Sequence, residues 1–187
     1  MQTLSHRSIE NPIIKDRVTF LETAAETGGK YTAMLLELAP NGYNELHTHK
    51  SFDEIFTVLE GRLGLQLCGE KFILEVGESV RVKAGDEHCF FNPSSTEKAV
   101  AHVLLDTASR GMEISLQVAY GLARDGRTNK KGIPWNPYHL AMLVHWSDTN
   151  LPKLFRFLEP LFRWLQQQAV RKGIDQELIR QYVSIQY

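Results

Sequence analysis

Short apolar runs alternate with turn residues along the first two thirds of the chain. Between Val18 and Ala119 these runs are rich in β-branched, aromatic and other apolar residues, which is typical of strands. Turn-forming groups such as Glu60-Gly61 and Ala84-Gly85-Asp86 separate them. The pattern predicts an all-β barrel or sandwich in which antiparallel neighbours are joined by short loops. The expected strands cover Tyr31–Leu38, Leu46–His49, Glu54–Leu59, Arg62–Leu67, Lys71–Leu74, Ser79–Val82, His88–Phe91, Lys98–Leu105 and Glu113–Tyr120.

The pattern changes after Tyr120. The segment Gly121–Pro137 is rich in glycine, proline and charged residues, so it predicts an extended linker or an arm that lies over the barrel. Helical spacing begins only beyond this segment. We therefore divide the chain into residues 1–120, which form the β-barrel, and residues 121–187, which form a linker or arm and a helical extension.

The helical extension has recognisable start and stop signals. Asn150 is a candidate helix cap, and Pro160 predicts a kink or a split in the helix because it lacks an amide proton and crowds the preceding turn. Gly173 marks an expected end, and Asp175–Val183 is expected to form a last short helix. The apolar positions at helical intervals are Leu151, Leu154, Phe155, Leu158, Leu161, Phe162 and Leu165.

Composition and charge restrict the class of protein. Of the 187 residues, 43% are hydrophobic and 23% are charged, which is ordinary for a folded globular protein. The absence of a long apolar run gives no sign of a leader or a membrane span, so we expect a cytoplasmic protein. Residues 1–120 carry 11 basic and 17 acidic side chains, whereas residues 121–187 carry 10 and 5. The basic residues are scattered, and therefore no nucleic-acid partner is expected.

Four residues have the types and spacing of a metal site. His47 and His49 are two positions apart in an expected strand, so both project to the same face. Glu54 opens the next strand, where an antiparallel neighbour brings its carboxylate near both imidazoles. His88 comes from a later run that a barrel can fold back against the site. Three imidazoles and one carboxylate suit one divalent transition ion, namely Fe, Mn, Ni, Cu, Co or Zn.

Apolar residues are expected around this ion. The alternation along the strands places Phe56, Val58 and Phe90 on the same interior face as the ligands. An apolar wall around an ion with open coordination positions is typical of a small-molecule site. These three residues are therefore the candidate substrate pocket.

The two segments that contain these residues resemble the two motifs of the cupin superfamily. The first runs from Gly42 to Gly61 and has the His-x-His pair and the glutamate, while the second runs from Gly77 to Asn92 and has two glycines, a histidine and an asparagine. The resemblance covers about residues 30–105 and identifies a small, single-domain, conserved-barrel cupin. It implies a mainly β double-stranded β-helix, the cupin jelly-roll barrel, followed here by C-terminal α-helices. It also implies that His47, His49, Glu54 and His88 are the metal ligands, and that the chain forms a homodimer.

Three functional hypotheses follow. The first is a metal-dependent enzyme that acts on a small organic molecule, either a dioxygenase-like oxidoreductase or an isomerase, because the cupins include both. The second is a cupin that binds or senses a small ligand without turnover. In the third the barrel is a scaffold, and the basic helical tail docks to a partner or a membrane surface. No general acid or base is identified, and the remaining histidines are expected to be structural: His6, His102, His139 and His145.

Overall fold

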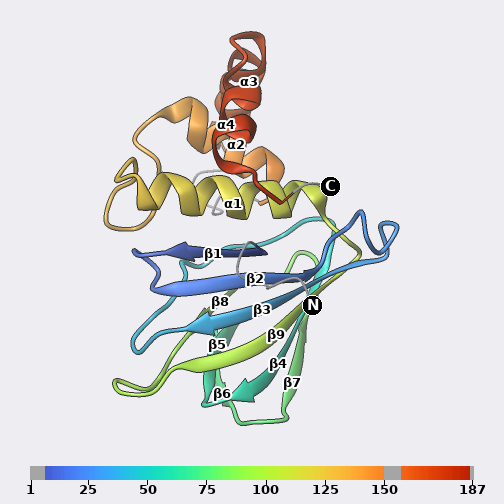
Figure 1. Cartoon of the computed structure of the whole chain (residues 1–187), viewed down its shortest axis with the longest axis vertical. Helices are drawn as coiled ribbons and strands as arrows, with labels where there is room; N and C mark the ends of the chain where they lie inside the picture. Colours follow the sequence, from blue (N-terminus) through green and yellow to red (C-terminus); the bar gives the residue numbers. More distant parts are fainter. Residues whose placement is uncertain (1–6, 150–156, 186–187) are drawn as a thin grey trace.

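The computed structural model describes residues 7–149 and 157–185. Nine strands precede four helices in the described part of the chain (Figure 1). The strands are β1 (Ser8–Asn11), β2 (Asp16–Glu22), β3 (Tyr31–Leu38), β4 (Asp53–Glu60), β5 (Leu63–Leu67), β6 (Glu70–Leu74), β7 (Ser79–Val82), β8 (His88–Phe91) and β9 (Ala99–Asp106). The helices are α1 (Arg110–Arg124), α2 (Pro137–Trp146), α3 (Glu159–Arg171) and α4 (Ile174–Tyr182).

The strands form two antiparallel sheets that face each other. The larger sheet has the order β1-β2-β3-β9-β4-β7, and the smaller one has the order β6-β5-β8. Strand β9 pairs with both β3 and β4, so strands far apart in the sequence become neighbours at the centre of the large sheet. This is the cupin fold, a mostly β N-terminal part followed by four helices, and the predicted fold class is confirmed.

Alternation along the strands fills the space between the sheets. In β4 the side chains of Glu54, Phe56 and Val58 are buried, whereas the residues between them are partly exposed. Apolar residues from both sheets form one continuous core, which includes Phe20, Leu65 and Leu105. Because a one-residue slip of β4 would turn this buried set towards solvent, the same core fixes which way Glu54 points.

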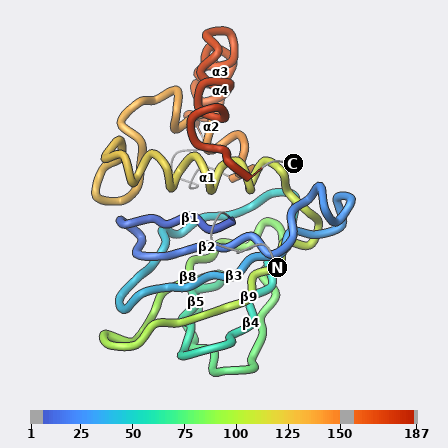
Figure 2. The backbone as a smooth tube through the Cα atoms, in the orientation of Figure 1, coloured from blue at the N-terminus to red at the C-terminus, as the bar shows by residue number. Residues whose placement is uncertain are grey.

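Helix α1 lies alongside β1 and covers the barrel on that side (Figure 2). Its first turn is capped by Ser109, whose hydroxyl accepts a hydrogen bond from the amide of Met112 at 3.1 Å. The strand predicted at Glu113–Tyr120 is therefore wrong, because this segment lies inside α1. Helix α1 is buried on two sides, so polar residues such as Ser115 and Gln117 are buried together with its apolar residues.

The predicted linker is shorter than expected. Helix α1 continues through Gly121 to Arg124, and α2 begins at Pro137. The segment between the two helices contains a single β-bridge, between Thr128 and Pro134. The predicted boundary after residue 120 falls within α1, and the division of the chain into two domains stays a prediction.

The last two helices differ from the prediction at their start. The expected cap at Asn150 lies outside the described residues. Pro160 is the second residue of α3, where its missing amide proton removes no helical hydrogen bond. The part of the predicted helix before residue 157 lies outside the described residues, so the kink or split expected at Pro160 stays a prediction. Gly173 has φ of 70° and separates α3 from α4, and the short helix expected over Asp175–Val183 is present as α4. A second apolar cluster joins α1 to the other three helices.

Part of α3 is open to solvent. The side chains of Phe157, Leu161 and Trp164 are exposed at the start of α3 and just before it. Among the described residues, no helix is long and apolar enough to cross a membrane. The homodimer and the membrane-surface contact of this tail stay predictions.

A buried pair of polar side chains ties α1 to the barrel. The Tyr120 hydroxyl on α1 donates a short hydrogen bond to Oδ2 of Asp16 on β2, and both residues are buried. Burial raises the pKa of Asp16 to about 7, although the bond from Tyr120 acts against this shift. Burial together with the Asp16 carboxylate raises the pKa of Tyr120, so this phenol is neutral at pH 7.

The Asp16 carboxyl makes stability depend on pH. The ordinary pKa of this carboxyl is 3.8, and in the folded chain it is about 7. Between these two pH values the unfolded chain has lost a proton that the folded chain keeps. The free energy of unfolding therefore falls as the pH rises through this range, and it levels off above it. Asparagine still accepts the bond from Tyr120 but does not ionise. We expect Asp16→Asn to match the native protein near pH 4 and to be more stable at pH 8, by up to about 4 kcal/mol at ~1.4 kcal/mol per pKa unit. Urea unfolding of both proteins across this range tests the prediction, and a constant difference would contradict it.

Candidate metal centre

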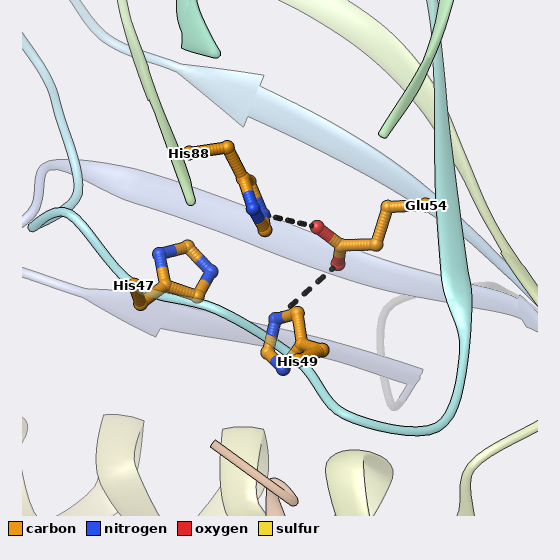
Figure 3. Close-up of side chains that lie close together, drawn as sticks. All are labelled: His47, His49, Glu54 and His88. Atoms are coloured by element: carbon orange, nitrogen blue, oxygen red, sulfur yellow. Dashed lines mark hydrogen bonds and ion pairs between the residues drawn. The ribbon is translucent and has the colours of Figure 1, made fainter. Parts of the chain in front are cut away.

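Four side chains converge between the two sheets. His47, His49, Glu54 and His88 each offer one ligand atom, and these four atoms all lie within 4.8 Å of one another (Figure 3). His49, Glu54 and His88 are 3%, 6% and 1% exposed, while His47 is partly exposed. The structure thus brings together all four residues that the sequence predicts as ligands.

Two of the four residues come from facing strands. Glu54 is the second residue of β4 in the large sheet, and it points inward with Phe56 because they are two residues apart. His88 is the first residue of β8 in the small sheet. The group therefore lies where the two sheets face each other, which gives it a rigid support on both sides.

The other two residues lie on the segment before β4. The strand predicted at Leu46–His49 is wrong, because this segment makes only isolated bridges. His47 and His88 exchange both backbone hydrogen bonds at 2.9 Å, whereas His49 is bridged to Thr149. These bridges still bring both imidazoles to the group, and His47 lies with its ring centroid 4.3 Å from that of His88.

Backbone carbonyls orient all three imidazole rings through Nδ1. His47 Nδ1 lies 2.9 Å from the Glu45 oxygen, His88 Nδ1 lies 3.1 Å from the Asp86 oxygen, and His49 Nδ1 lies 3.2 Å from the Ser147 oxygen. A ring that donates from Nδ1 keeps a lone pair on Nε2, which is the form in which histidine binds a metal.

The Nε2 atoms turn towards the Glu54 carboxylate. His88 Nε2 lies 2.9 Å from Oε2, and His49 Nε2 lies 3.9 Å from Oε1. The buried Nε2 of His49 has no hydrogen-bond partner among the described residues. A buried polar atom without a partner is costly in a folded protein. A single cation among these four groups would satisfy it, so the residues present fit a metal ion.

The charges of the group also suit a cation. Burial is the main cause that lowers the pKa of His47, to about 3, and it lowers that of His49 as well, so both rings are neutral at pH 7. Burial alone would raise the pKa of Glu54, but the surrounding imidazoles outweigh it and bring the value to about 2. Burial also acts to lower the pKa of His88, yet the bond to Glu54 gives a net rise. The centre therefore presents one carboxylate among imidazoles.

Apolar side chains border the centre on one side. Glu54, Phe56 and Phe90 line an internal cavity of about 50 Å³, and the two phenyl rings lie 6.0 Å apart between centroids. Val58 is buried further along β4, in the core and away from this cavity. Two of the three residues of the predicted pocket thus border the space next to Glu54. Their role in substrate binding stays a prediction.

The C-terminal part of the chain also contributes to the centre. The Ser147 carbonyl that holds His49 belongs to the turn after α2, 98 residues further along the chain. The same turn accepts a hydrogen bond from the amide of Lys50 at the Asp148 oxygen, at 3.2 Å. Two neighbouring residues of the ligand segment are thus fixed by the end of α2, and no local pattern in the sequence marks this contact.

Among the described residues, the histidines expected to be structural lie outside the metal group. His139 is buried in α2, His102 is on β9, and His145 is exposed near the end of α2. His6 lies outside the described residues. The fold thus brings three particular histidines together with Glu54, and the other described histidines are not part of the group.

Glycine 111 allows a test of the link between α2 and His49. A Cβ atom at Gly111 on α1 would clash with the carbonyl oxygen of Trp146, the residue before Ser147. Gly111→Ala should therefore displace the end of α2 and weaken metal binding by about tenfold or more, as is typical when a ligand's orienting partner is lost. Competition with a chromogenic chelator measures the affinity. The exposed His145→Ala at the same end of α2 serves as control, and equal affinities in all three proteins would refute the link.

Comparison with known proteins agrees with this geometry. Residues 34–105 match the family model described as Cupin_2, cupin domain. Quercetin 2,3-dioxygenase of Bacillus subtilis (strain 168) is 29% identical over 86 residues, which are 46% of this chain and 26% of that protein. Germin-like protein 12-2 of Oryza sativa subsp. japonica is 31% identical over 119 residues, which cover 54% of this chain and 52% of that protein. The chain thus spans only about a quarter to a half of these relatives.

Solved structures give a fold-level likeness. KdgF from Halomonas sp. matches with a TM-score of 0.47 and 16% identity, over 52% of this chain and 84% of that one. An RmlC-like cupin from Shewanella frigidimarina matches with the same TM-score and 17% identity, over 55% and 85% of the two chains. The matched segment 34–105 contains all four residues of the metal-site-like group. Residues 34–105 of this chain therefore form a Cupin_2 domain.

Proposed function

We propose that this protein is a metal-dependent enzyme that acts on a small organic molecule. One observation carries the proposal: three imidazoles and one carboxylate converge within 4.8 Å, and the carboxylate residue, Glu54, also lines a small, mainly apolar cavity. This combination matches the usual form of a catalytic metal site, in which a few polar groups lie in a mainly apolar pocket. The ion would be one of Fe, Mn, Ni, Cu, Co or Zn, held by His47, His49, Glu54 and His88.

The bound ion would supply a Lewis acid and, if redox-active, an electron-transfer centre. The residues of the chain have different roles. The carbonyl partners of the three imidazoles keep Nε2 of each ring available as a ligand atom. Glu54 lies 2.9 Å from His88 Nε2 and 3.9 Å from His49 Nε2, so we assign it as a ligand and not as a general base. Phe56 and Phe90 form part of an apolar wall next to Glu54.

Two classes of reaction suit such a site, namely oxidation by dioxygen and isomerisation. A dioxygenase-like oxidation is supported by the quercetin 2,3-dioxygenase among the relatives, although that match spans only 26% of the relative. Isomerisation through an enol is the second class, because the same Lewis acid would stabilise an enolate oxygen. The small cavity favours a substrate with few heavy atoms in either case. Binding of such a ligand without turnover is the alternative.

Metal analysis tests the basis of this proposal. Protein purified without added metal or chelator should hold about one transition-metal ion per chain, because four ligands converge on one point. His49→Ala should lose most of that ion. His102→Ala is the matched control, since this histidine lies on β9 outside the group. Circular dichroism shows whether each variant is folded. Native protein that neither holds nor takes up any of these ions would refute the proposal.

The reaction class is tested with the metal-loaded protein. Short hydroxy-carbonyl compounds are incubated with it in D₂O, and both dioxygen uptake and deuterium incorporation are recorded. A dioxygenase consumes dioxygen, whereas an isomerase that forms an enol exchanges a carbon-bound proton without dioxygen uptake. Neither activity should survive in His49→Ala. A metal-loaded protein that shows neither over a broad set of compounds would favour the binding role.

A further inference from the structure

The His49 ring is only loosely held by the Glu54 carboxylate. His88 Nε2 lies 2.9 Å from that carboxylate, whereas His49 Nε2 lies 3.9 Å from it and has no hydrogen-bond partner among the described residues. The hydrogen bond that the structure records for the His49 ring joins Nδ1 to the Ser147 carbonyl at 3.2 Å. A bond at one ring atom still lets the ring tilt about that atom, because hydrogen-bond angles vary widely.

A phenyl ring supplies a second constraint on this imidazole. Phe52 stacks on the His49 ring, with 4.5 Å between the ring centroids and 27° between the ring planes. Aromatic rings at this separation attract each other in a stacked arrangement. Both residues are 3% exposed, so the contact is shielded from water. The flat face of Phe52 therefore sets the plane of the His49 ring, while the Ser147 carbonyl sets the direction of Nδ1.

The register of β4 places Phe52 against His49. Phe52 directly precedes β4, and its side chain is buried like those of Glu54 and Phe56, which follow at alternate positions. Alternate residues of an extended chain point to the same face, so all three side chains point inward. The same stretch of chain thus delivers the carboxylate of the group and the ring that stacks on one of its imidazoles.

The other two imidazoles of the group do not fix this plane. His47 meets the His49 ring edge-on, with 4.8 Å between the centroids and 76° between the planes. His88 is further away, at 5.6 Å, and its plane is tilted by 54°. Of the rings recorded near His49 in the described part of the chain, Phe52 is the one that lies nearly parallel to it.

We propose that Phe52 is a positioning residue that keeps the His49 imidazole in the orientation from which Nε2 binds the ion. Phe52 offers no ligand atom and acts through the plane of the ring. A ring that is already oriented loses little freedom when the ion binds, and this raises the affinity. The inference deepens the proposed function and rests on it for the ion, whereas the orientation of the ring in the ion-free chain does not depend on it.

A role in filling the core predicts a different outcome. Phe52 belongs to the apolar core of the barrel, and so does the fully buried Phe20 on β2, which is not among the rings recorded near the group of four. Phe20→Leu removes the same atoms from the same core without changing the stack on His49, so it is the matched control for Phe52→Leu. Phe52→Met fills the site with a flexible chain that has no flat face, and it covers the case in which Phe52→Leu fails to fold.

Two measurements on the full chain follow the ring and the ion separately. Long-range ¹H–¹⁵N NMR of the ion-free, histidine-labelled protein shows which nitrogen of His49 carries the proton, and the His49 signals are assigned by their absence from His49→Ala. Competition with a chromogenic chelator measures the affinity for Zn²⁺. We expect the native ring to carry its proton on Nδ1, which donates to Ser147. Phe52→Leu and Phe52→Met should mix the two tautomers and weaken Zn²⁺ binding by about tenfold, whereas Phe20→Leu should match the native chain in both.

Two results would overturn the inference: Phe52 variants that keep the native tautomer and affinity, or a Phe20→Leu variant with the same losses as Phe52→Leu. A change in only one of the two measurements would also overturn it, because the affinity is proposed to depend on the orientation of the ring. If the native chain binds Zn²⁺ and the Phe52 variants do not differ from it, only this inference fails. If the chain takes up none of the transition ions, the proposed enzyme function fails, and the tautomer of the Phe52 variants decides by itself whether Phe52 orients the ring.

Discussion

The burial of one carboxylate among three imidazoles is the constraint on which the rest of the structure depends. Glu54 lies inside the barrel, where an unpaired negative charge would be strongly unfavourable. Its pairing with His88 on the opposite sheet resolves this, and so the two sheets are joined by a polar contact as well as by the apolar core. A stable arrangement of such a polar group needs every ring held in one orientation, which the three backbone carbonyls achieve.

The four residues that come together were predictable from the sequence because their signals are local. His47 and His49 are separated by one residue, and Glu54 opens a strand whose alternation of buried and partly exposed positions is clear. His88 was found through its motif. The expected strand at Leu46–His49 was wrong without harm to the site, since two isolated bridges place these imidazoles as a strand would have done.

The errors and omissions have physical causes. The strand expected at Glu113–Tyr120 is wrong because Ile114, Leu116 and Val118 alternate with polar residues, which is also the period of a half-buried strand. No pattern in the sequence predicts the contacts of Ser147 and Asp16, because these contacts depend on the tertiary fold. An aspartate and a serine have no local context that marks them as partners of residues about a hundred positions away.

The contact between His49 and the turn after α2 also means that the group of four is completed late in the synthesis of the chain. A ribosome delivers the N-terminal part of a chain first, so the four metal-site residues emerge well before residue 147. Until α2 has been made and packed, the His49 ring lacks the carbonyl that fixes its orientation. The nascent barrel therefore lacks part of the framework that orients the group of four, and the arrangement seen in the structure appears only when the helical extension has packed against it.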